Sequence, residues 1–342
     1  MIPGLKKLSA LFVLICIFFS CNNDKIPDVS TIKIDLKVER FDHDFFAIDS
    51  NNILNEMQRL RIKYPYFIRD FTGQILGFDD KTPADSLTKY LNLFIRDYRF
   101  VKDSADKIFK DFEMQAKEIK KGLQFVKYYF PVYRAPNKVI TFIGPFDGYS
   151  DVLTADALAV GLQLHLGKDF SFYNTAVAQD LFPDYIKQKF TPEYIPVNCL
   201  KNIVDDMFPD KSTGKALIEQ MVEKGKRIYL LDKFLPYTSD YLKIGYTEKQ
   251  LKDCYTNEAI IWDFFLNNDL LNSSDQNIVK NYIGESPKTQ ELGEGSPGNI
   301  GTFSGWQIVK KFMNKNQKIT LEDLMKTDAR EIYNQSKYKP RN

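Results

Sequence analysis

Histidine is nearly absent from this 342-residue chain, which contains only His43 and His165. Neither a His-Glu-x-x-His nor a Cys-x-x-Cys motif occurs, so the common zinc-binding patterns are missing. We therefore predict no metal site. We interpret His43, which lies between Asp42 and Asp44, as a solvated turn residue, and His165 as a neutral or surface histidine.

The chain also lacks a charge excess. Its formal net charge is +2, which Lys6 and Lys7 of the N-terminal segment supply, so the remainder is close to neutral. Nucleic-acid binding requires a clustered basic excess. We therefore predict no nucleic-acid partner, and no membrane attachment through a polybasic surface.

Motifs that mark a catalytic nucleophile or a phosphate site are missing too. No Gly-x-Ser-x-Gly elbow occurs. Gly293, Gly295 and Gly298 have Gly-x-Gly-x-x-Gly spacing, but polar residues flank them, whereas a phosphate-binding loop follows a strand and opens a helix. We interpret this stretch as a flexible loop.

Carboxylates are abundant, and several stand in pairs. Paired acids can perform acid–base chemistry, but they are more typical of solvated helix faces. From the residues alone we predict no catalytic site and no cofactor. The pairs in question are Asp79 with Asp80, Asp205 with Asp206, and Glu258 with Asp263.

Cysteine is scarce, with four in the chain. Cys16 and Cys21 belong to the N-terminal segment, which leaves Cys199 and Cys254. Both stand in apolar, helix-like surroundings, which favours two buried free thiols. A disulfide between them is the alternative outside the cytoplasm.

What the chain does contain is a short apolar run before Cys21. Residues 11–19 carry no charge and follow two lysines, which is typical of a signal peptide. The run is too short to span a bilayer, which takes roughly 20 apolar residues. Ser20 before Cys21, with polar residues after it, resembles a bacterial lipobox.

We therefore predict a signal peptide at 1–20 and a tether at 21–31, with Cys21 as the lipid attachment site for acyl chains such as palmitate. More than one chain is needed to hold a protein stably on a membrane. The folded part would then work at a membrane surface, outside the cytoplasm. An uncleaved anchor and an ordinary secretory signal are the alternatives.

Residues 32–342 are predicted to form one globular α+β domain that is mostly helical, with a small sheet. The 27 Phe and 19 Tyr supply a large core. Alternating patterns predict strands at 31–41 and 158–166, and a β-branched and aromatic run predicts another at 139–143. The charged face of the first suits a sheet edge. Helical spacing predicts helices at 52–71 (disturbed at Pro65), 83–98, 104–130, 197–208, 213–235, 258–266, 275–283 and 306–313. Capping-box spacing predicts two further helix starts, at Thr247 and Thr320. The Gly-, Ser- and Pro-rich stretch at 286–305 is predicted to be a long loop.

Several short segments stand in a characteristic order. They are Tyr64-Pro65, GLQLHLG at 161–167, GYT at 245–247, NEAIIWDFF at 257–265 and SPGNIGTFSGWQIVKKFM at 296–313. Together with the lipobox, and across nearly the whole chain, they resemble the gliding-motility lipoprotein family GldB. The resemblance implies a cell-envelope lipoprotein needed by the gliding machinery, which is bound up with protein secretion across the outer membrane. Only Cys21 carries over as a site residue.

The resemblance favours a protein that is not an enzyme: a non-catalytic assembly or stability factor, facing the periplasm. Its partners would be envelope proteins of the gliding and secretion machinery, and the membrane through the lipid anchor. The segment at Gly305-Trp306 also resembles, more faintly, the C-terminal end of zinc-protease domains. Those domains need a His-Glu-x-x-His helix, and 197–208 contains no histidine, so this likeness implies a degenerate zincin-like scaffold that has lost its metal site. The alternatives are a cryptic hydrolase using His165 and carboxylates, and a small-ligand site between helices.

Overall fold

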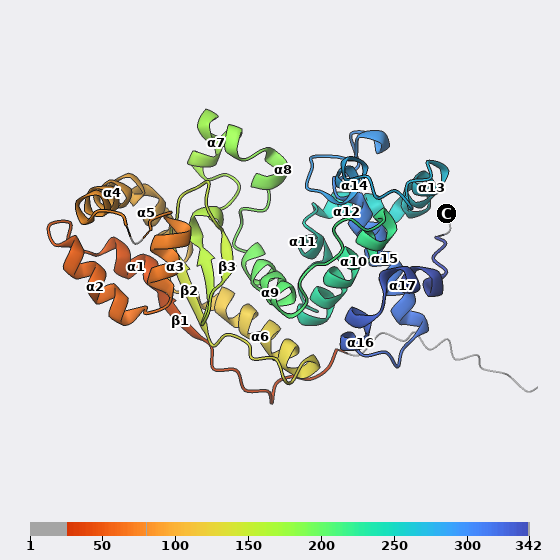
Figure 1. Ribbon diagram of the computed structural model, residues 1–342, viewed down its shortest axis with the longest axis horizontal. Coiled ribbons are helices and arrows are strands. Elements are labelled where there is room, and N and C mark those ends of the chain that lie inside the picture. The colour runs from red at the N-terminus through yellow and green to blue at the C-terminus, as the bar shows by residue number, and fades with distance from the viewer. Residues whose placement is uncertain (1–25, 80, 341–342) are drawn as a thin grey trace, which may run out of the picture.

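A four-stranded mixed sheet forms the centre of the N-terminal half (Figure 1). The structure, a computed structural model, describes residues 26–79 and 81–340. The strands are ordered β1-β2-β4-β3, and the first three in that order run parallel while β3 is antiparallel to β4. The predicted small sheet and the predicted edge position of the first strand are confirmed. The strands are β1 (Lys37–Arg40), β2 (Lys138–Phe142), β3 (Asp151–Leu153) and β4 (Leu158–Gly161).

Two predicted strands are shorter than their alternation indicates. Residues 31–36 form no strand, and the Ile32 carbonyl accepts a hydrogen bond from Gln124 Nε2 at 2.7 Å. Beyond β4, Leu162–Leu164 form the 3₁₀-helix η2. The side chain of Gln163 there accepts a hydrogen bond from the Gly144 amide at 3.0 Å. The chain therefore leaves the sheet before His165.

Helices and aromatic rings pack beside β1 and β2. The ring of Phe41 is central, with the ring centroids of Phe45, Tyr64, Phe67 and Phe71 at 4.7–5.5 Å. The break expected at Pro65 is confirmed, because one helix ends before it and the next starts after it. These elements are α1 (Phe41–Phe46), α2 (Ile53–Lys63), α3 (Phe67–Asp70), the π-helix η1 (Phe71–Ile75), α4 (Ala84–Asp97) and α5 (Arg99–Ile108).

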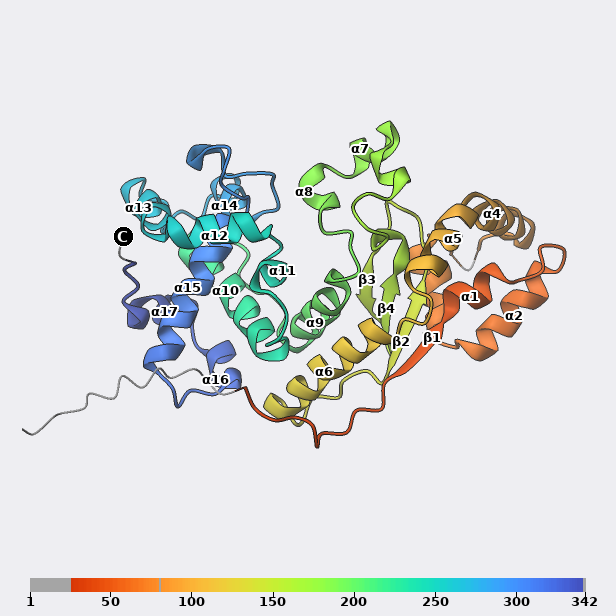
Figure 2. The ribbon, with the colours of Figure 1, turned by 180° about the vertical axis from the view of Figure 1, so that it is seen from behind.

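Two longer helices join the halves of the molecule, α6 (Glu113–Tyr129) and α9 (Tyr194–Met207) (Figures 1 and 2). The single helix predicted at 104–130 is wrong. Phe109 and Phe112 are buried between α5 and α6, and Phe112 has a φ of +57°, which interrupts the helix.

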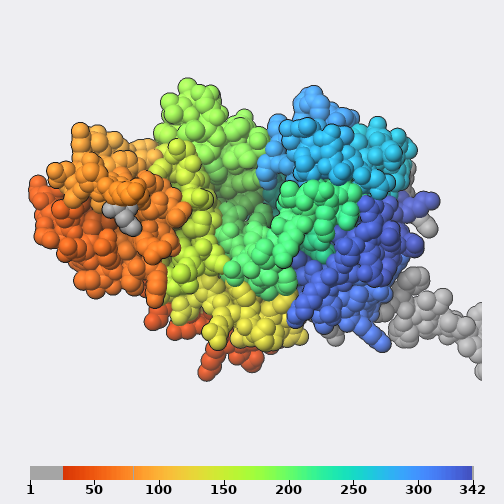
Figure 3. Space-filling view, viewed as in Figure 1, coloured from red at the N-terminus to blue at the C-terminus, as the bar shows by residue number. Residues whose placement is uncertain are grey.

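A small arm precedes α9 at the upper edge of Figure 1. It contains η3 (Ser171–Asn174), α7 (Ala176–Leu181) and α8 (Asp184–Lys187). Figure 3 shows a hollow between this arm and the C-terminal helices. Lys189 crosses to the C-terminal half, where its ammonium lies 2.6 Å from a Glu285 carboxylate oxygen.

The C-terminal half consists of helices and the loops that join them, with no strand in the described residues. Both predicted capping boxes are present, Thr247 with Gln250 and Thr320 with Asp323. No helix in the described ranges is both long and apolar enough to cross a bilayer. The elements are α10 (Leu217–Phe234), α11 (Asp240–Ile244), α12 (Glu248–Thr256), α13 (Glu258–Asn267), α14 (Gln276–Ile283), η4 (Gln290–Leu292), α15 (Ile300–Lys315), α16 (Leu321–Lys326) and α17 (Ala329–Ser336).

The tightest helix crossing lies between α10 and α15. A methyl group on Gly305 of α15 would overlap the carbonyl oxygen of Met221 on α10, and one on Gly225 would overlap the Gly305 backbone. The predicted loop at 286–305 is therefore wrong at its end, because α15 begins at Ile300. The small residues there serve a backbone-to-backbone contact rather than a turn.

Candidate functional site

The predicted lipid site, Cys21, lies outside the described residues. The first described residues line a groove of about 1030 Å³ beside the C-terminal ends of α6, α10 and α15 and the start of α16. We call it the tether groove, because the segment that follows Cys21 forms part of its wall. Its lining is Ile26, Pro27, Tyr128, Tyr129, Tyr229, Asp232, Lys233, Pro236, Met313, Asn314, Gln317, Ile319, Thr320 and Leu321.

The acid in this wall, Asp232, is held by its neighbours. Its carboxylate accepts a hydrogen bond from Trp306 Nε1 at 2.7 Å and from Lys243 Nζ at 3.1 Å. The Lys310 ammonium lies 3.4 Å from a Trp306 ring centroid. Burial raises the pKa of Asp232 and lowers the pKa of Lys310. The cluster stabilises the α10–α15 contact and offers the groove no free acid.

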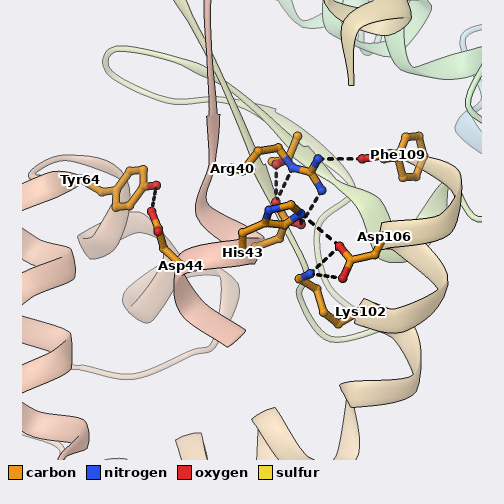
Figure 4. A network of polar contacts seen from close by, with 9 residues as sticks. Arg40, His43, Asp44, Tyr64, Lys102, Asp106 and Phe109 are labelled. Carbon is orange, nitrogen blue, oxygen red and sulfur yellow. Dashed lines mark hydrogen bonds and ion pairs between the residues drawn. The ribbon is translucent and has the colours of Figure 1, made fainter. Parts of the chain in front are cut away.

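A second polar cluster centres on Asp42, which is fully buried. Figure 4 shows Arg40, His43 and Phe109 of this cluster. Arg40 Nε and Nη2 donate to its carboxylate at 2.9 and 2.8 Å, and Thr141 Oγ1 donates at 2.5 Å. Arg40 Nη1 also donates to the Phe109 carbonyl at 2.7 Å. The cluster thus joins β1, α1, β2 and the end of α5.

His43 belongs to the outer part of this cluster. Its Nε2 lies 3.1 Å from Asp106 Oδ1 and 3.6 Å from Asp42 Oδ2. Lys102 Nζ contacts both Asp106 oxygens at 2.5 Å. The turn predicted for His43 is wrong, since the residue lies in α1, where its side chain is half-exposed.

Three residues here, Asp42, His43 and Asp106, have potential metal-ligand atoms within 4.8 Å of one another. The arrangement nevertheless fits a metal ion poorly. The Asp42 carboxylate already holds the Arg40 guanidinium, and the Asp106 carboxylate already holds the Lys102 ammonium. A divalent cation would have to displace two existing cations to bind.

His165 forms a separate, buried cluster, so of its two predicted alternatives, a neutral or a surface histidine, the surface position is wrong. Its Nε2 lies 2.8 Å from Asp151 Oδ2, and its Nδ1 lies 3.2 Å from the Thr191 carbonyl. Ser150 Oγ is 3.4 Å from the same Nε2. A catalytic triad places the serine and the carboxylate on opposite ring nitrogens. Here both are on one nitrogen, so the geometry is not that of a triad.

Helix α9 completes this cluster with two amides. Asn198 Nδ2 donates to Asp151 Oδ2 at 2.8 Å, and Asn202 Nδ2 donates to the Asp151 carbonyl at 2.9 Å. The two asparagines have the i, i+4 spacing of the histidines in His-Glu-x-x-His. Cys199, fully buried, stands where that motif has its glutamate. In this chain the helix face therefore supports β3.

The two cysteines in the described residues are free and buried, as the favoured prediction had it, and no disulfide joins them. Burial raises the pKa of Cys254 to about 12 and raises the pKa of Cys199 well above its usual range. Both thiols are therefore protonated and unreactive at neutral pH.

The acids that stand in pairs in the sequence do not form a site in the described residues. Four of them are each bonded to another side chain, Asp263 is exposed, and Asp80 lies outside the described ranges. The bonded ones are Asp79 (from Thr82, 3.0 Å), Asp205 (Arg227, 2.5 Å), Asp206 (Tyr133, 2.8 Å) and Glu258 (Tyr338, 2.6 Å).

The glycine motif at Gly293, Gly295 and Gly298 is a loop, as predicted. It follows the 3₁₀-helix η4 rather than a strand, and α15 starts only at Ile300. The phosphate-cradle context is not met.

The fold and its clusters describe a mostly helical α+β protein in which the carboxylates of Asp42, Asp151 and Asp232 are each bound by partners inside the fold. The model of the family described as gliding motility protein GldB matches residues 22–340, nearly the whole chain. The chain therefore belongs to the GldB family, which confirms the resemblance and implies a part in gliding motility. No curated protein and no solved structure matches the chain.

Proposed function

We propose that this protein is a lipid-anchored envelope component of the gliding machinery, facing the periplasm and held through Cys21. The lipobox-like segment supports the anchor. The abbreviation "lipo" in the label of the matching family supports it further. The tether then leads within a few residues to the groove wall at Ile26.

Within this proposal the folded body acts by contact, as a non-catalytic assembly or stability factor for envelope proteins of the gliding and secretion machinery. The observation that supports this is that side chains able to act as acids or bases are bound by other side chains of the fold. Asp151 is bound by His165, Asn198 and Asn202, and Asp42 is bound by Arg40. Groups engaged in this way are poorly placed to act on a substrate.

The anchor is tested with Cys21→Ala. We expect the variant to move from the membrane to the soluble envelope fraction and to lose its acyl mass, because thioether-linked lipid is the proposed attachment. Fractionation and intact-mass measurement read both effects. The control is Asn22→Ala, which leaves the sulfur in place and should remain on the membrane. Unchanged attachment and mass in Cys21→Ala would contradict the anchor.

A cryptic hydrolase is the second candidate, and one observation favours it: His43 lies near two carboxylates. We expect His43→Gln to restore spreading of a deletion strain and to crosslink to the same envelope proteins as the wild-type chain. The side chain is half-exposed, so its ion pairs contribute little to stability. Loss of spreading at normal protein abundance and unchanged crosslinking would favour the hydrolase instead.

A further inference from the structure

Exposed apolar side chains gather at the ends of α6 and α10. Val132 is 89% exposed and Tyr237 is 71% exposed. Each directly follows a proline, Pro131 or Pro236, in the loop that ends its helix. A proline cannot continue the helix, so the next side chain is turned out of the helical packing.

The two loops are neighbours, and the tether lies beside them. The ring centroids of Phe130 and Phe234, at the two helix ends, are 5.9 Å apart. Tyr128 and Pro236 line the same groove as Ile26, and both Tyr128 and Ile26 are about half-exposed. Ile26, Tyr128, Val132 and Tyr237 therefore form one surface, which we call the lipid-facing surface.

The length of chain before Ile26 indicates what meets this surface. Cys21 precedes Ile26 by five residues, and five fully extended residues span at most about 18 Å. The acylated sulfur of the proposed function must therefore lie within that distance of the surface. In Figures 1 and 2 the segment after Ile26 runs along the lower edge of the molecule, whereas α7 lies at the opposite, upper edge.

The chemistry of the surface fits a lipid headgroup region. Tyrosine has an apolar ring and a polar hydroxyl, and it is enriched where membrane meets water. Lysines stand around it: Lys121 lies 5.5 Å from the Phe125 ring centroid, and Lys233 lies 5.0 Å from that of Tyr229. Ammonium groups near a membrane are attracted to anionic headgroups.

We propose that the lipid-facing surface inserts into the headgroup region of the leaflet that holds the acyl chains. The inserted side chains are those of Ile26, Tyr128, Val132 and Tyr237. The folded domain then contacts the membrane through the C-terminal ends of α6 and α10, and the arm that contains α7 points away from the membrane. This inference rests on the proposed function, because it requires the lipid on Cys21.

The test uses the full acylated chain reconstituted into phosphatidylethanolamine–phosphatidylglycerol vesicles that contain doxyl-labelled lipid. Val132→Cys is labelled with bimane, and Val177→Cys on α7 is the matched control, 66% exposed on the opposite edge. Tyr237→Cys is a second probe. The buried native thiols should take up little label, and the wild-type chain measures that background.

We expect doxyl quenching at Val132→Cys and Tyr237→Cys to exceed quenching at Val177→Cys by at least about twofold, since interfacial groups reach roughly 5–10 Å into the headgroup boundary. Equal quenching of all three probes on vesicles that carry the protein in flotation would overturn the lipid-facing surface and leave the anchor intact. Failure of the wild-type chain to float with the vesicles would overturn both proposals.

Discussion

Gly305→Ala is expected to destabilise the fold by at least about 3 kcal/mol, the upper part of the range for overpacking in a core. The added methyl group would overlap the Met221 carbonyl oxygen, which is backbone and cannot turn aside. The helices α10 and α15 would have to separate. Their separation would loosen the packing of Trp306, which is fully buried between them and bonded to Asp232. Urea unfolding followed by circular dichroism measures the change.

Gly295→Ala is the matched control for this experiment. No atom lies within 4 Å of a methyl group built on Gly295. The same chemical change there should shift the unfolding free energy by less than about 1 kcal/mol. If both variants unfold at the same urea concentration, the helix crossing accommodates a methyl group at Gly305 and the interpretation is wrong.

Asp42→Ala is expected to cost about 3–5 kcal/mol, the range for breaking a buried ion pair from one side. In the variant, the Phe109 carbonyl is the one group of the cluster that still accepts a hydrogen bond from the Arg40 guanidinium. The buried Thr141 hydroxyl loses the carboxylate to which it donates. The loss of stability therefore comes mainly from buried polar groups that are left without hydrogen-bond partners, rather than from the loss of the ion-pair attraction itself. Urea unfolding again provides the measurement.

Two comparisons make this prediction specific. Asp97→Ala removes an exposed carboxylate paired with Arg96, and it should cost no more than about 1 kcal/mol. The double variant Arg40→Met with Asp42→Ala removes both charges and should recover part of the loss. If the loss in the double variant equals the sum of the losses in the two single variants, the two charges contribute independently and this account is wrong.

The features that local patterns predicted are those whose cause is local. The capping boxes at Thr247 and Thr320 need only residues three positions apart, and Pro65 interrupts a helix by its own ring. The edge position of β1 was visible in its alternating charges, which suit a strand with one open side.

The errors have tertiary causes. Gly301 and Gly305 have a loop-like composition, yet they are helical because close packing on α10 outweighs their low helix propensity. His165 continues the alternation of a strand, but Gln163 diverts the chain through side-chain bonds to distant backbone.

The polar clusters were the hardest part to foresee. Asp42 and Asp106 are far apart in sequence and come together only because α1 and α5 dock on one another. The i, i+4 pair Asn198 and Asn202 was the one local signal of the Asp151 cluster. An asparagine pair alone does not indicate what it will bind, so the partner became evident only from the fold.

The order of the strands along the chain has a consequence for biosynthesis. β1 pairs with β2, about a hundred residues later, and β2 is completed only when β4 arrives at Leu158–Gly161. An emerging polypeptide therefore keeps the backbone hydrogen-bonding groups of β1 without their β2 partner until roughly half of the chain has been made. Such delayed, non-local pairing is slow and exposes the chain to aggregation, so we expect the N-terminal half to need protection until β2 and β4 have joined the sheet.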